Sequence, residues 1–200
     1  SDAYLAPTAR GAADPTALAN GYVWAVEILE GLTPWDVVQA TQEAFACGEP
    51  MQPRMIEVTP GKTRFPAPFF YAEMVELIAE LRRHEFDVWI ISASNVWSVR
   101  WMVTKALNPL LEAHGAASGI PADHVVGVSS LLHDQAGSLY KDALLVRENP
   151  PYAALEERAL RSFRLTSRLQ YPVPTYAGTV GCLWAAIGRR PYLAAGDRPG

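Results

Sequence analysis

Small hydroxyl and amide side chains follow an apolar run in the middle of the chain. The run from Phe86 to Ile91 is rich in β-favouring residues, and Ser92, Ser94 and Asn95 come directly after it. A short continuous apolar run is typical of a strand buried on both faces of a parallel sheet. Ligands bind beyond the carboxyl ends of such strands, and a helix that begins there offers free N–H groups to an anion. The stretch therefore predicts a phosphate site.

A second predicted strand end, late in the sequence, carries a carboxylate. Residues 191–195 have strand character, and Gly196 and Asp197 follow them. A carboxylate after a glycine that allows a sharp turn is well placed to bind a hard cation such as Mg²⁺. Mg²⁺ beside a hydroxyl and a helix N-terminus would form a phosphoryl-transfer site. A helix cap at Ser92 and a turn at Gly196-Asp197 are the simpler explanations of each feature alone, and the combination favours the site.

Helices and strands alternate around these positions. Apolar residues at helical spacing predict a helix over residues 70–83, with an inward stripe of Met74, Leu77, Ile78 and Leu81. A second helix follows Asn95 and would end at Asn108-Pro109. Its stripe is Val96, Val99, Val103 and Leu107, with Arg100 and Lys105 on other faces. Residues 125–128 predict a further strand and residues 180–187 a further helix. This order predicts the α/β class, with right-handed crossovers and a parallel sheet.

The first third of the chain has helical patterns with no preceding strand. After a flexible N-terminal segment, one helix is predicted from Gly21 to Gly31 and another from Pro34 until Gly48, with Thr33 as its N-cap. A short extended piece at residues 55–58 and a proline-rich loop follow. We therefore predict two units, with an insertion in the second that contains a hairpin and irregular structure. The ranges are a helical cap over residues 1–66, an α/β core over residues 67–200 and an insertion at about 129–178.

The composition favours a globular protein and excludes several classes of partner. Hydrophobic residues make up 50% of the chain, and the net charge is −4, which gives no electrostatic reason to expect nucleic acid or an anionic membrane. No apolar run is long enough for a transmembrane helix, and no signal peptide is recognisable. We expect a soluble protein, cytoplasmic in preference to periplasmic or secreted. Cys47 and Cys182 are predicted to be buried, reduced thiols.

These segments in this order resemble the haloacid dehalogenase (HAD) superfamily, specifically its phosphatases with an early helical cap. Residues 74–94 are similar to the helix and strand before the family's second motif, whose Ser or Thr binds the phosphoryl group; that role maps to Ser92. Residues 119–127 are similar to the next segment of phosphoserine- and phosphocholine-phosphatase-like members. Residues 187–197 are similar to the run into the fourth motif, whose first acidic residue binds Mg²⁺; that role maps to Asp197. The resemblance implies a doubly wound, mostly parallel sheet.

Two parts of the family pattern are missing from this sequence. Family members begin with a strand that ends in Asp-x-Asp-x-Thr, where the first Asp is the nucleophile and the second the general acid/base. Asp2 and Asp14 lack the preceding apolar strand. The third motif is a Lys, and the matching position holds Thr179, whose neutral hydroxyl cannot replace that charge. A cation from elsewhere could take its place, from among Lys141, Arg161, Arg164 and Arg168. We expect these residues to be part of a longer polypeptide that supplies the nucleophile.

The resemblance implies Mg²⁺-dependent hydrolysis of a small phosphorylated organic substrate through an aspartyl-phosphate intermediate. Ser92, Thr179 and Asp197 occupy the catalytic positions, and Asp197 is the metal ligand. Ser92, Ser94 and Asn95 would bind the phosphoryl group. Aromatic residues of the cap would enclose the leaving group, by cation–π contact where it is a quaternary ammonium, or would instead form the core of the cap. These aromatic residues are Tyr22, Trp24 and Trp35.

Two alternatives stay open. One is a non-catalytic HAD-like protein that binds a phosphorylated ligand or a protein partner, which the substitution at Thr179 and the absent nucleophile favour. The other is a different doubly wound protein, such as a nucleotide-binding domain, in which residues 92–95 cap a helix at another ligand's phosphate. The lack of a Gly-rich loop argues against this second alternative.

Overall fold

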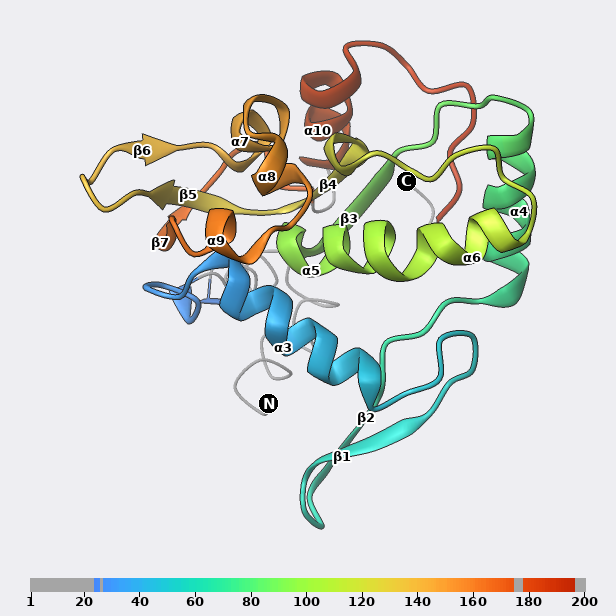
Figure 1. Cartoon of the computed structure of the whole chain (residues 1–200), viewed down its shortest axis with the longest axis horizontal. Helices are drawn as coiled ribbons and strands as arrows, with labels where there is room; N and C mark the ends of the chain where they lie inside the picture. The colour runs from blue at the N-terminus through green and yellow to red at the C-terminus, as the bar shows by residue number, and fades with distance from the viewer. Residues whose placement is uncertain (1–23, 26, 175–177, 197–200) are drawn as a thin grey trace.

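A computed structural model describes residues 24–25, 27–174 and 178–196 of the chain (Figure 1). These residues form a mixed α/β structure in which the strands make three small sheets. The predicted α/β class is therefore confirmed. In the described part of the chain one pair of strands is parallel and the other pairings are antiparallel, which is less parallel structure than the resemblance implies.

The parallel pair is formed by β3 (Ile90–Asn95) and β4 (Val125–Val128). One long helical segment connects them, and it consists of α5 (Val96–Trp101), the π-helical segment η1 (Met102–Leu107) and α6 (Asn108–Ala113). A 3₁₀ turn, η2 (Ala122–His124), leads into β4. The helix α4 (Ala72–Arg83) precedes β3, as the sequence predicts. A strand, a helix and a parallel strand thus place the ends of β3 and β4 at the same edge.

The remaining strands form antiparallel sheets. β1 (Met55–Thr59) and β2 (Thr63–Pro66) make a hairpin that projects from the body of the molecule (Figure 1). β5 (Ser130–His133) lies between β6 (Leu139–Tyr140) and β7 (Arg164–Leu169). The predicted hairpin after residue 129 is present, as the antiparallel pair of β5 and β6. Three short helices connect β6 to β7: α7 (Asp142–Glu148), α8 (Pro150–Ala153) and α9 (Glu157–Leu160).

The helix α3 (Pro34–Ala46) begins where its cap residues predict. Thr33 and Asp36 form a reciprocal capping box: the Thr33 N–H donates to Asp36 Oδ2 at 2.8 Å, and the Asp36 N–H donates to Thr33 Oγ1 at 3.2 Å. Val37 and Val38 of α3 are buried in one hydrophobic core together with residues of α5, β5 and α7 to β7. The predicted boundary between cap and core at residue 66 stays a prediction, and α3 is packed directly on the α/β part.

A second hydrophobic core lies between α4, the long helical segment and β4. On α4 the fully buried residues are Val75 and Ala79, whereas Met74 and Leu77 are each 41% exposed. The inward stripe predicted for this helix is therefore wrong at Met74 and Leu77 and confirmed at Ile78, which packs against this core. Small side chains on the buried face let α4 approach α6 closely, so packing rather than the largest apolar residues sets the orientation of the helix.

The helix after β3 does not end at Asn108-Pro109, contrary to the prediction. Pro109 has no N–H, and its ring would clash with the carbonyl four residues earlier in a regular α-helix. The π-helical turns of η1 precede it, and the Asn108 N–H bonds to the Val103 carbonyl, five residues back. We attribute the continuation of the helix to this wider turn, which relieves the clash. The Asn108 side chain then bonds to both backbone groups of Ile120, at 2.8 and 3.0 Å.

The carboxyl-terminal part contains the predicted helix and lacks the predicted strand. The helix is α10 (Gly178–Ile187). In the described residues β3 pairs with β4 only, so residues 191–196 have no strand partner, and Tyr192 is 95% exposed. Cys182 is buried as predicted, but Cys47 is exposed because it is the C-cap of α3. Among the described helices, none combines the length and the apolar character needed to cross a membrane.

Candidate functional site

The carboxyl end of β3 leaves the sheet just before α5 begins. The ladder with β4 pairs Ile91 with Val126 and then Asn95 with Val128, so three residues of β3 lie opposite one residue of β4. These three residues, 92–94, therefore bulge out of the ladder. Bulges re-aim side chains and are frequent next to binding sites. We refer to residues 92–95 as the strand-end loop.

Gly127 is the single residue of β4 opposite the bulge, and its lack of a side chain makes the loop possible. A Cβ at Gly127 would lie 2.8 Å from the Ser94 carbonyl oxygen and 2.7 Å from Val96 Cα. Contacts this short do not occur with real side chains. The backbone of the strand-end loop can therefore lie this close to β4 only because residue 127 is a glycine. Close approach of two backbones is a common reason for a glycine inside a strand.

The polar groups of the strand-end loop differ in how many partners they have. Ser92 is half-buried, and its Oγ accepts the Ser94 N–H at 3.1 Å, which leaves the hydroxyl proton of Ser92 for another acceptor. Ser94 is exposed. Asn95 is the N-cap of α5, and its Oδ1 accepts the Ser98 N–H at 2.9 Å. The two N–H groups of its side-chain amide remain available as donors to a ligand. The loop therefore presents spare donors, which suit an anionic ligand.

The other predicted site residues are spread over the molecule. Thr179 is half-buried in the first turn of α10. Trp24 is half-buried. Trp35 is half-buried on α3, where the Arg161 guanidinium lies 5.9 Å from the centre of its ring. Trp35 thus packs between α3 and α9, which agrees with a role in the core. Asp197 and Tyr22 lie outside the described residues.

The strand-end loop does not by itself fit Mg²⁺. The strand-end loop offers hydroxyl and amide groups and no carboxylate, which is the ligand that Mg²⁺ requires most. Throughout the described ranges, no three or more His, Cys, Asp or Glu side chains are grouped so that they could hold a metal ion. Asp197 is outside these ranges. We therefore assign no step to Mg²⁺, and its involvement remains a prediction.

Two of the cations considered as replacements for the missing Lys have other partners. Arg161 forms ion pairs with Glu157 at 2.8 Å and with Asp36 at 3.5 Å. Arg164 donates to the Gly31 carbonyl at 2.7 Å. These contacts hold both side chains at the junction between α3, α9 and β7. Which cation takes the place of the Lys at the position of Thr179 remains a prediction.

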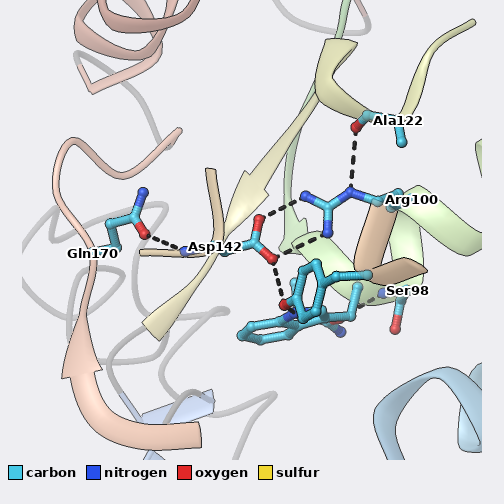
Figure 2. A network of polar contacts seen from close by, with 8 residues as sticks. Ser98, Arg100, Ala122, Asp142 and Gln170 are labelled. Atoms are coloured by element: carbon cyan, nitrogen blue, oxygen red, sulfur yellow. Dashed lines mark hydrogen bonds and ion pairs between the residues drawn. The ribbon is translucent and has the colours of Figure 1, made fainter. Parts of the chain in front are cut away.

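A buried polar network, which the sequence did not predict, lies one turn further along α5 (Figure 2). Arg100 and Asp142 are 1% and 3% exposed, and they form two parallel hydrogen bonds of 3.1 and 2.6 Å. The Tyr152 hydroxyl donates to Asp142 at 2.9 Å and accepts the Trp97 indole N–H at 2.8 Å. We refer to these four residues as the arginine network. It joins α5 to α7 and α8.

Backbone groups and a glutamine complete the arginine network. Arg100 Nε donates to the Ala122 carbonyl at 3.3 Å, and the Asp142 N–H donates to Gln170 Oε1 at 3.2 Å (Figure 2). Burial disfavours the charge of Arg100, but the carboxylate of Asp142 outweighs it and raises the pKa of the guanidinium. Burial, and then the charge of Asp142, raise the pKa of Tyr152 well above its usual value, so the phenol remains a neutral donor.

The arginine network had a signal in the sequence. Arg100 lies four residues after Val96 and three before Val103, a spacing that places it on the buried stripe of the helix rather than on another face. An arginine on an apolar stripe needs a carboxylate partner, because an unpaired buried charge is very costly. The identity of that partner could not be read, since Asp142 lies 42 residues further along the chain.

Comparison with known proteins adds no family to this description. The sequence matches no protein-family model and no curated protein.

Proposed function

We propose that this chain carries the phosphoryl-binding part of a HAD-like phosphomonoester hydrolase, in which an aspartate outside the printed sequence is the nucleophile. The observation that supports the proposal is the strand-end loop. It bulges from the carboxyl end of a parallel strand and carries spare hydroxyl donors at the edge where α/β proteins bind ligands. The proposal includes a doubly wound sheet of which β3 and β4 are two members.

The loop residues would hold the phosphoryl group while its oxygens carry negative charge. Ser92 Oγ is oriented by the N–H of Ser94, so its proton can be donated to a phosphoryl oxygen. The hydroxyl of Ser94 and the amide of Asn95 are further donors in the same loop. Donors that are already oriented stabilise charge without reorganisation, and this is the largest protein contribution to phosphoryl transfer.

The chemistry itself requires the external aspartate. Its carboxylate oxygen forms a bond to phosphorus as the bond to the substrate alcohol breaks. The second Asp of the same missing motif donates a proton to the departing oxygen and then takes a proton from the attacking water. Water then attacks the aspartyl phosphate, which releases inorganic phosphate and restores the carboxylate. The residues described here bind and orient the group that is transferred.

A second candidate function is binding of a phosphorylated ligand without turnover. The observation that favours it is Thr179, which lies in the first turn of α10 and brings no charge to the position where HAD phosphatases have a Lys. This candidate requires the strand-end loop in the same role. It differs from the first in predicting phosphate affinity with no hydrolysis.

Turnover and binding by the full-length protein test these two functions. We expect hydrolysis of para-nitrophenyl phosphate, and a decrease of about 100-fold in its rate in Ser92→Ala, the typical cost of removing one such donor. Ser162→Ala is the matched control, because the Ser162 hydroxyl, in the turn after α9, is exposed and donates to the Arg158 carbonyl of that helix.

Each result has one interpretation. Phosphate affinity that depends on Ser92, measured by calorimetry without turnover, supports the binding protein. Full activity in Ser92→Ala, or equal losses in Ser92→Ala and Ser162→Ala, would show that the strand-end loop does not bind the phosphoryl group.

A further inference from the structure

Two hydroxyl groups connect α3 to the beginning of α5. Thr41 on α3 is 8% exposed, and its Oγ1 donates to the Val37 carbonyl at 2.8 Å. That bond uses the only proton of the Thr41 hydroxyl. The oxygen of Ser98 lies 2.6 Å from Thr41 Oγ1, so Ser98 must be the donor in this second bond. The direction of both hydrogen bonds is therefore fixed.

Ser98 is also the residue that Asn95 holds. The backbone N–H of Ser98 donates to Asn95 Oδ1 at 2.9 Å, which closes the first turn of α5 over the strand-end loop. The contacts thus form one continuous path from the backbone of α3 at Val37, through Thr41 and Ser98, to the last residue of the loop. The three hydrogen bonds of the path are 2.6 to 2.9 Å long, Thr41 is buried and Ser98 is half-buried.

Packing on both sides keeps this path in place. Val37 and Val38 of α3 lie in the same core cluster as Val96 and Trp97 of α5. One turn further on, the rings of Phe45 and Trp101 meet edge to face, with their centres 5.6 Å apart. α3 therefore lies against the helix that starts at the strand-end loop, as Figure 1 shows. A shift of α3 would act on Ser98 directly.

We infer that Thr41 is a positioning residue for phosphoryl binding, acting through Ser98 and Asn95 on the strand-end loop. The inference rests on the proposed function, because it concerns the same site. It assigns to α3 a role in holding the loop in its binding geometry. Loss of the Thr41 hydroxyl removes one hydrogen bond to Ser98 and frees the first turn of α5, so phosphate affinity should decrease while the fold is kept.

Thr104 provides a matched control within the same molecule. Its Oγ1 donates to the carbonyl four residues back, that of Arg100, at 2.8 Å, just as Thr41 bonds to Val37. Thr104 has no second hydroxyl partner among the described residues. Thr41→Val and Thr104→Val therefore remove the same bond within a helix, and only Thr41→Val also removes the bond to α5.

The experiment measures the affinity of the full-length protein for inorganic phosphate by calorimetry, together with thermal unfolding. We expect Thr41→Val to weaken phosphate binding by between about twofold and about tenfold, the effect of one hydrogen bond. Thr104→Val should bind like the wild type, and Thr41→Ser should restore binding. Ser98→Ala should match Thr41→Val, and the double variant should lose no more than either single variant.

The outcomes separate this inference from the proposed function. A wild-type protein without phosphate affinity, or with affinity that Ser92→Ala leaves unchanged, would remove the proposed function. Affinity that depends on Ser92 but is equal in Thr41→Val and the wild type would overturn the role of Thr41 alone. Equal losses in Thr41→Val and Thr104→Val would also overturn it, since both would then report helix stability. Where Thr41→Val does not fold, wild-type affinity in Ser98→Ala overturns the inference and weakened affinity supports it.

Discussion

The strand-end loop at the end of β3 and the arginine network around the helix that follows it use their polar groups in opposite ways. In the network the guanidinium, carboxylate, phenol and indole all have partners, and the residues are buried. In the loop, hydroxyl and amide donors remain without partners among the described residues, and Ser94 is exposed. Polar groups that saturate one another hold elements together, whereas oriented donors with spare capacity suit a ligand. The comparison predicts that changes in the network affect stability and changes in the loop affect binding.

The largest expected effect is in the network. Asp142→Ala leaves Arg100 buried without a counter-charge, and we expect a loss of about 3 to 5 kcal/mol in the free energy of unfolding, measured by urea titration. Glu80→Ala, which breaks an exposed ion pair with Arg83, should cost less than about 1 kcal/mol. Phosphate affinity of the folded Asp142→Ala protein should be unchanged. A stability loss as small as that of Glu80→Ala would contradict the prediction that the arginine network stabilises the fold.

Gly127→Ala tests whether the loop depends on the close approach to β4. The new methyl group would meet the Ser94 carbonyl and Val96, so we expect a loss of about 2 kcal/mol in stability and of phosphate affinity together. Gly137 lies in a turn with φ of +82° and has open space around it. Gly137→Ala should therefore lower the free energy of unfolding by about 1 kcal/mol through backbone strain alone and leave phosphate affinity unchanged. Unchanged phosphate affinity in a folded Gly127→Ala variant would contradict the geometry of the loop.

Tyr152→Phe gives the network a pH signature. The pKa of Tyr152 is raised well above the usual value by burial and then by Asp142. In the unfolded chain the phenol ionises near pH 10, so stability from this group is present below about pH 10 and falls by about 1.4 kcal/mol per pH unit above it. The free energy of unfolding of the wild type should therefore exceed that of Tyr152→Phe by about 1 to 2 kcal/mol at pH 8. The two free energies should converge as the pH rises beyond 10. Urea titrations at pH 8 and 11 measure this difference, and parallel curves would refute it.

The smallest effect on stability is expected in the loop itself. Ser92→Ala and Ser94→Ala should each change the free energy of unfolding by no more than about 0.5 kcal/mol, because neither side chain holds other elements together. The same variants should weaken phosphate binding in the calorimetric assay. A large loss of stability in Ser92→Ala would show that Ser92 has a structural role like that of the network residues. It would contradict the predicted difference between the two regions.

Elements specified by local signals were predictable from the sequence. The cap of α3 at Thr33, the helix α10 and the strand β4 are where their residues indicate. The buried face of α4 was not fully predictable, because it is set by packing against residues far away in the chain. The helix across Pro109 required a π-helical turn, for which the sequence carries no recognisable local signal.

The candidate site was predictable in part. The position of Ser92 to Asn95 at the end of β3 follows from the switch between strand and helix patterns. The bulge opposite Gly127 and the path from Thr41 to Ser98 depend on strand register and on helix packing, which a single sequence does not specify. Asp197 lies outside the described residues, so the predicted metal position remains a prediction.

The hairpin of β1 and β2 also makes the full-length protein easy to label. It extends away from both regions compared above (Figure 1), and an added Cβ at Gly61 in its tip would meet no atom within 4 Å. Exposed tips of this kind tolerate inserted residues. A short peptide tag or a single fluorophore placed between Gly61 and Lys62 should therefore report on the protein in binding and localisation assays without disturbing the strand-end loop.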